Sequence, residues 1–168
     1  MVVIAQALTT AGIDHALIGG LAVLVRGKSR VTFDIDFLVA AQRREAFVDI
    51  LRQLGFEPFH EASAFGNYMR EDGRRVDALY ARSALGQGML ERACKESLGD
   101  VALSVIAAED LIGLKLQALA NDPSRYRDWG DIRGILDLRR DEINMQRVRD
   151  YFGLFGFHEE LERLLAHQ

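Results

Sequence analysis

The chain has 168 residues, of which 49% are hydrophobic and 27% are charged, and its formal net charge is −4 at pH 7. This length and composition predict one globular domain, or one domain with a small appendage, and exclude a disordered chain, a collagen-like chain and a disulfide scaffold. The acidic balance excludes a global positive field that would draw the protein onto nucleic acid or anionic lipid.

The single cysteine, Cys94, has no partner for an internal disulfide, which indicates a reducing compartment. No apolar run approaches the roughly 18 residues that a membrane helix needs. The N-terminal stretch lacks the basic start of a signal peptide. We therefore expect a cytoplasmic protein with no membrane partner.

The first part of the chain predicts helix, strand, double glycine and helix in that order. A glycine follows the first helical run and ends it, and the strand is a short apolar run bounded by glycines. The expected ranges are 2–11 for the first helix, 15–18 for the buried strand and 21–26 for the second helix, with Gly19 and Gly20 directly after the strand.

Residues 31–39 give the strongest strand signal in the chain, because they are β-branched and aromatic and alternate in polarity. Side chains repeat on one face every second residue. Phe33, Ile35 and Phe37 are therefore expected on one face of a strand, with Asp34 and Asp36 together on the other.

The remaining pattern changes from mixed to purely helical near residue 107. The first part predicts a helix over 42–54, strands over 56–60, 67–70 and 74–80, a tight hairpin at Asp72-Gly73, and a further strand over about 101–106. The second part predicts helices that start at Ala108, at Ser124, near 144 and near 157. We expect an α+β fold, in which a mixed sheet with helices over 1–107 is followed by a helical region over 108–168 that packs on it as one compact unit.

Two aspartates on one strand face need an explanation. Asp34 and Asp36 lie a few ångströms apart and repel each other by about 1 kcal/mol even at the dielectric constant of water. Asp77 stands on a strand that can pair beside theirs and supplies a third carboxylate. Three such groups suit Mg²⁺ or Mn²⁺, including two ions that flank a displacement at phosphorus. The alternative is a pair of exposed aspartates that protect an edge strand from aggregation.

The flanks of this strand favour an anionic ligand. Gly19 and Gly20 close a strand and open a helix, where backbone N–H groups can face a phosphate. Arg26, Lys28 and Arg30 precede the aspartates and can neutralise a triphosphate. The alternatives are a tight turn that uses glycine for its geometry and a solvated basic rim.

Together these residues resemble the nucleotidyltransferase superfamily, which has the polymerase-β-like fold. The match consists of Ile18–Ala22 followed, after about a dozen residues, by the Asp-X-Asp strand that ends the segment Arg26–Asp36. The resemblance implies that the backbone at Gly19 and Gly20 approaches the nucleotide phosphates and that Asp34 and Asp36 bind metal and triphosphate. It also implies that Asp77 binds a second metal and helps to deprotonate an acceptor hydroxyl.

The closest likeness is to the minimal bacterial branch that contains the abortive-infection (AbiEii-like) toxins. Residues 108–118 look like the lysine-bearing helix of that branch, and residues 127–132 look like its Arg-Asp-X-X-Asp helix. The resemblance implies that Lys115 contacts phosphate in the catalytic cleft, and that Asp128 or Asp131 orients Lys115 or the metal site. The alternatives are a lysine that extends along an apolar face to solvent, and two ordinary surface aspartates.

The implied activity is the Mg²⁺-dependent transfer of a nucleoside monophosphate from an NTP to a hydroxyl group of an RNA 3′ end such as that of tRNA, of a protein or of a small molecule. One position departs from the family pattern: Leu21 stands where many members carry a serine whose hydroxyl contacts the terminal phosphate. This departure motivates an alternative, a catalytically inactive nucleotide- or partner-binding relative such as a toxin–antitoxin component with a cognate antitoxin. A metal-dependent glycosyltransferase, which also uses Asp-X-Asp, is a more distant alternative.

Overall fold

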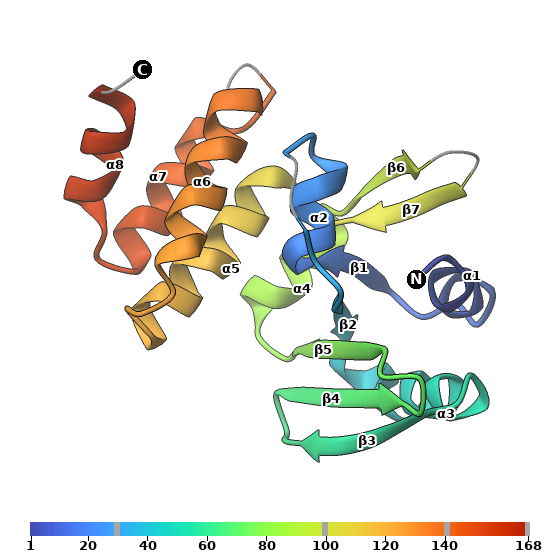
Figure 1. Cartoon of the computed structure of the whole chain (residues 1–168). Helices are drawn as coiled ribbons and strands as arrows, with labels where there is room; N and C mark the ends of the chain where they lie inside the picture. Colours follow the sequence, from blue (N-terminus) through green and yellow to red (C-terminus); the bar gives the residue numbers. More distant parts are fainter. Residues whose placement is uncertain (29–30, 99–100, 140–141, 167–168) are drawn as a thin grey trace. The chain divides into compact units, whose positions relative to one another are not determined.

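The computed structural model describes residues 1–28, 31–98, 101–139 and 142–166, and its elements are labelled in Figure 1. The chain divides into two compact units. The first contains Met1–Val25 and Arg30–Ile106, and the second contains Arg26–Ser29 and Ala107–Gln168. Four residues that the sequence analysis placed in the first region therefore belong with the C-terminal helices. The expectation that 108–168 packs on the first region as one compact body stays a prediction.

The first unit is built on a mixed sheet, which confirms the α+β class. Within the described residues the sheet has seven strands in the order β3-β4-β5-β2-β1-β7-β6. The pairs β2–β5 and β1–β7 are parallel, and the other neighbours are antiparallel. The strands are β1 (His15–Ile18), β2 (Ile35–Ala40), β3 (Phe56–Glu61), β4 (Phe65–Arg70), β5 (Arg75–Ala81), β6 (Cys94–Leu98) and β7 (Val101–Val105).

The helices of the first unit supply apolar faces for this sheet. Phe47 is fully buried and makes edge-to-face contacts with Tyr68 and Tyr80, at ring-centroid distances of 5.9 and 6.4 Å. Such aromatic pairs add to the stabilisation that burial alone provides. The helices are α1 (Val2–Thr10), α2 (Gly19–Val25), the short 3₁₀ turn η1 (Ala41–Arg43), α3 (Arg44–Gln53) and α4 (Ala84–Glu91).

The acidic strand is shorter than the sequence predicts. β2 starts at Ile35, and the residues from Val31 to Asp34 are not in a strand. Phe33, expected on one strand face with the buried Ile35 and Phe37, is 88% exposed, and Val31 is 83% exposed. The physical reason is that both neighbouring strands stop here: β1 ends at Ile18, the register partner of Asp36, where the chain turns into α2, and β5 begins at Arg75, one residue before the register partner of Ile35. Residues before Ile35 consequently have no β1 residue to pair with.

The second unit consists of helices, as the sequence predicts. α5 (Ala108–Asn121) packs against α6 (Tyr126–Arg139) and α7 (Met145–Leu154), and α7 packs against α8 (His158–Ala166). The α5–α7 contact is close, because a Cβ atom at Gly113 would lie 2.8 Å from the ring of Tyr151. The hydroxyl of Tyr151 donates a 2.7 Å hydrogen bond to Asp110. In the described part of the chain, no helix is both long enough and apolar enough to cross a membrane.

His15 gives the first unit a predicted pH dependence. Its Nδ1 donates to the carbonyl of Ile13 at 2.8 Å, the residue is 7% exposed, and its Nε2 is buried without a hydrogen-bond partner. Burial lowers the pKa of this imidazole, and the hydrogen bond to Ile13 opposes the shift only in part. The unfolded chain therefore takes up a proton near pH 6.5 that the folded chain resists.

We expect the free energy of unfolding to fall as the pH drops below about 6.5, by at most about 1.4 kcal/mol per pH unit. Urea unfolding of the wild type and of His15→Gln between pH 7.5 and 5.5 measures this, since the glutamine side chain does not titrate there. Parallel pH profiles for the two proteins would contradict the assignment to His15.

Candidate functional site

Two of the predicted carboxylates are neighbours on the sheet. Asp36 on β2 and Asp77 on β5 are register partners in a parallel pair, so their side chains project from the same face of adjacent strands. Both side chains are half-buried, whereas Ile35 and Phe37 on the other face of β2 are buried. Adjacent strands lie about 4.8 Å apart. Asp36 and Asp77 therefore form a close acidic pair.

The double glycine lies against this pair. Gly19 is the first residue of α2 and has φ +63°, a conformation that favours glycine. A Cβ atom at Gly19 would lie 2.8 Å from Cβ and 2.5 Å from Cγ of Asp36, which is closer than atoms can approach. The Gly-Gly turn and the acidic strand, found separately in the sequence, thus meet at one point, and only glycine leaves room for the Asp36 carboxylate.

Gly19→Ala is expected to destabilise the first unit by roughly 2–4 kcal/mol, because it combines a strained backbone with an overlap at Asp36. Gly12→Ala is the matched control: Gly12 has φ +61°, but a Cβ atom there meets nothing within 4 Å. It should cost only about 1 kcal/mol. Urea unfolding of both variants measures the difference, and an equal loss would show that the approach of Asp36 contributes nothing.

Asp34 does not lie on the sheet with Asp36 and Asp77. It is half-buried and lies one residue before β2, outside the sheet register. Among the described residues, no group of three or more His, Cys, Asp or Glu side chains is arranged to hold a metal ion. The donor chemistry of the Asp36–Asp77 pair still suits Mg²⁺, which takes one or two protein carboxylates and completes its shell with water and substrate phosphates. Metal binding by Asp34, Asp36 and Asp77 stays a prediction.

Sequence reasoning missed one polar residue of this site. Asn67 on β4 is the register partner of Asp77, and its Nδ2 donates a 2.7 Å hydrogen bond to Asp77 Oδ1. A two-residue turn at Asp72-Gly73 would place residue 68 opposite residue 77, but the loop has three residues, 71–73, and this shifts the register by one so that Asn67 faces Asp77. Asn67, Asp77 and Asp36 thus occupy successive positions across three strands.

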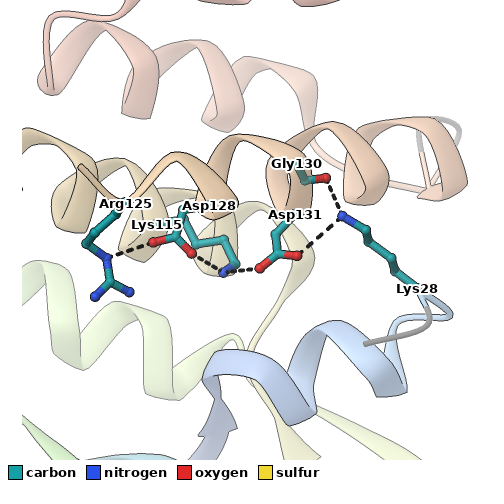
Figure 2. A network of polar contacts seen from close by, with 6 residues as sticks. All are labelled: Lys28, Lys115, Arg125, Asp128, Gly130 and Asp131. Carbon is teal, nitrogen blue, oxygen red and sulfur yellow. Dashed lines mark hydrogen bonds and ion pairs between the residues drawn. The ribbon is translucent and has the colours of Figure 1, made fainter. Parts of the chain in front are cut away.

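A second polar cluster lies within the helical unit (Figure 2). Lys115 on α5 donates from Nζ to Asp128 Oδ1 at 2.7 Å and to Asp131 Oδ2 at 2.8 Å, and all three side chains are buried. Arg125 Nε also donates to Asp128, at 2.8 Å. The structure therefore brings together the three C-terminal residues that the sequence singled out. Their roles at a nucleotide site stay predictions.

The charges of this cluster favour ionised aspartates. Burial alone would raise the pKa of Asp128, but the hydrogen bonds and positive charges of Lys115 and Arg125 outweigh it and leave the pKa below its usual value. A buried carboxylate is tolerated when cations of this kind compensate it. Asp128 and Asp131 are thus not the ordinary surface residues of the alternative interpretation.

Two of the basic residues before the acidic strand, Arg26 and Lys28, do not form the solvated rim of the alternative interpretation. Lys28 Nζ donates to the carbonyl of Gly130 and, at 3.3 Å, to Asp131 Oδ1 (Figure 2). Its side chain lies along α6, where a Cβ atom at Gly134 would come within 2.8 Å of Lys28 Cε. Arg26 is buried, at 8% exposure. Arg30 lies outside the described residues, and triphosphate binding by all three stays a prediction.

The fold is that of the nucleotidyltransferases, as comparison with solved structures shows. The antibiotic-resistance factor ANT(2″)-Ia in solution has a TM-score of 0.71 and 17% identity, covering 98% of this chain and 94% of that one. Its crystal structure in complex with adenylyl-2″-tobramycin has a TM-score of 0.72 and 18% identity, covering 90% and 92%. The lincomycin-bound lincosamide adenylyltransferase LnuA has a TM-score of 0.59 and 18% identity, covering 81% and 94%. No family model and no curated protein matches the sequence.

Proposed function

We propose that the protein is a metal-dependent nucleotidyltransferase, which moves a nucleoside monophosphate from an NTP to a hydroxyl acceptor. The observation that carries this proposal is the placement of Asp36 beside Asp77 and directly against Gly19. This placement brings together the double glycine and the acidic strand, the two short motifs that suggested this chemistry in the sequence. The fold in which they meet is shared with nucleotidyltransferases. Mg²⁺ or Mn²⁺ is the proposed cofactor.

In this proposal, Asp36 and Asp77 hold the metal together with Asp34, and the backbone at Gly19 and Gly20 lies beside the phosphates. The metal supplies positive charge that stabilises the negative charge developing on the phosphoryl oxygens. The acceptor oxygen forms a bond to the α-phosphorus, the bond from that phosphorus to the bridging oxygen breaks, and pyrophosphate leaves. Asp77 accepts the proton of the acceptor hydroxyl.

For the acceptor we propose a small molecule that bears hydroxyl groups. The structures of ANT(2″)-Ia and LnuA are described with adenylyl-2″-tobramycin and lincomycin, and this chain covers more than nine-tenths of each. The Megavirus polyadenylate synthase also resembles the chain, with a TM-score of 0.54, but the chain covers only 31% of it. The net charge of −4 likewise gives no general attraction to RNA. An RNA 3′ end and a protein hydroxyl group are the other two acceptors to test.

The second candidate is a relative that binds nucleotide or a partner without transfer. Leu21 favours it, because this side chain provides no hydroxyl for a terminal phosphate. A toxin–antitoxin component with a cognate antitoxin as its partner is one form of this candidate. Membership of the abortive-infection branch, which the residues around Lys115, Asp128 and Asp131 suggested, is compatible with either candidate.

Labelled nucleotides separate the two candidates. The protein is incubated with NTP labelled at the α- or the γ-phosphate, with Mg²⁺ or Mn²⁺, and with aminoglycosides, lincosamides or total RNA as acceptors. We expect the α-label to move to an acceptor, the γ-label to leave in pyrophosphate, and EDTA to stop both. Binding of NTP without transfer to any acceptor would favour the second candidate. Absence of NTP binding would contradict the first candidate and the nucleotide-binding form of the second, and would leave only its partner-binding form.

A further inference from the structure

The hydrogen bond between Asn67 and Asp77 has no assigned role in the reaction described above. Asn67 Nδ2 donates to Asp77 Oδ1 at 2.7 Å, at the short end of the usual range for an N–H···O hydrogen bond. Within the described residues, this is the one hydrogen bond from a side chain that the Asp77 carboxylate receives. Asn67 therefore helps to fix the orientation of the Asp77 carboxylate.

The position of Asn67 explains why an orienting group is needed. Asn67 on β4, Asp77 on β5 and Asp36 on β2 occupy consecutive register positions across the sheet. Asp77 consequently has a carboxylate on one side and a carboxamide on the other. Repulsion between the two carboxylates favours rotation of the Asp77 side chain out of this row. The hydrogen bond from Asn67 opposes that rotation.

A neutral donor is well suited to this task. A lysine or arginine at position 67 would cancel the charge of Asp77 and compete with a cation, and an aspartate would add a third negative charge. The carboxamide of Asn67 donates a hydrogen bond and leaves the charge of the pair unchanged. The neighbours of Asn67 on the same face of β4, Phe65 and Met69, carry no such group.

We infer that Asn67 is a positioning residue, which holds the carboxylate of Asp77 in one orientation for metal binding and for the acceptor step. The inference rests on the proposed function. Its effect acts through Asp77, so removal of Asn67 should slow the step in which the acceptor reacts and should leave the binding of the NTP nearly unchanged.

Asn67→Val and Asn67→Ala both remove the donor, and valine is a good strand residue, so at least one variant should fold. Each is expected to lower kcat about tenfold, the effect of one lost hydrogen bond to a charged group, with the KM for NTP changed by less than about twofold. Mn²⁺ titration followed by electron paramagnetic resonance is expected to show severalfold weaker binding, without any need for turnover. Met69→Ala, on the same strand and face, is the control and should change neither quantity.

A double-mutant cycle tests whether Asn67 acts through Asp77. In an Asp77→Ala background, Asn67→Val should weaken Mn²⁺ binding no further. An additive effect, or an unchanged kcat and Mn²⁺ affinity in a wild-type background, would overturn the inference while the proposed function stands. Absence of transfer by the wild type would instead contradict the proposed function, and the Mn²⁺ titrations would still decide whether Asn67 supports Asp77.

Discussion

Asp36→Asn is expected to lower kcat by about 10³-fold, which corresponds to a loss of about 4 kcal/mol of transition-state stabilisation. The asparagine keeps the shape of the side chain, so it fits against Gly19 as the aspartate does. It removes the charge of one of the three carboxylates that the proposed site offers to a cation. The free energy of unfolding should change by less than about 1 kcal/mol, because the substitution is isosteric and Asp36 is only half-buried. Steady-state kinetics and urea unfolding of the same preparation measure the two effects.

The control for this variant is Asp49→Asn. The Asp49 side chain is 67% exposed on α3 and forms an ion pair with Arg52 at 3.7 Å, so its charge should not affect the reaction. Near-wild-type turnover by Asp36→Asn would exclude the acidic pair as the catalytic centre. A comparable loss in both variants would point to overall charge and not to the site.

Lys115→Met is expected to destabilise the protein by about 3 kcal/mol, the cost of leaving buried carboxylates without their shared cation. Lys115 is hydrogen-bonded to both Asp128 and Asp131, and its side chain is 7% exposed. Arg125 and Lys28 remain beside the aspartates in the variant and limit the loss. Urea unfolding at pH 7 measures the change.

The pH dependence of Lys115→Met identifies the cause. Without the ammonium group, less opposes the burial of Asp128, and we expect the pKa of its carboxyl group in the folded chain to rise above the unfolded value. Its contribution to instability is therefore present above about pH 4 and grows as the pH rises through the folded pKa. Relative to the wild type, the variant should be less destabilised at pH 5 than at pH 7.5. A loss in the free energy of unfolding that does not depend on pH would mean that lost packing and not charge is responsible. Lys95→Met, which replaces an exposed lysine of β6, is the control.

The elements that local pattern predicts well are those whose burial repeats regularly. In β5, Val76, Ala78 and Tyr80 are buried while Arg75 and Leu79 are exposed, as the alternation predicts. The helices after Ala108 begin within about two residues of the expected positions. The helix α4 and the edge strand β6 were not predicted. α4 contains Gly86 and Gly88 and depends on the N-cap Ser83, whose side chain accepts a hydrogen bond from Gly86 N.

The contacts that local pattern could not predict are those between residues far apart in the chain. The charge of Lys28 suggested a phosphate ligand, but its partners Gly130 and Asp131 are about a hundred residues away. The alternation that predicted a strand from Val31 was also misleading, because a strand needs a neighbour and β1 has already ended. By contrast, the acidic pair was found because Asp36 and Asp77 each lie in a strand with clear alternation. The role of Asn67 required the register of the hairpin as well.

The threading of the chain between its two units restricts how they can be separated. The chain leaves the first unit after Val25, contributes Arg26–Ser29 to the second, returns at Arg30 and crosses again after Ile106. A fragment that stops at residue 106 would keep Lys28 but lose Gly130 and Gly134 of α6, along which its side chain lies. Recombination that exchanges the C-terminal helices for another set must therefore also exchange the short loop between α2 and β2.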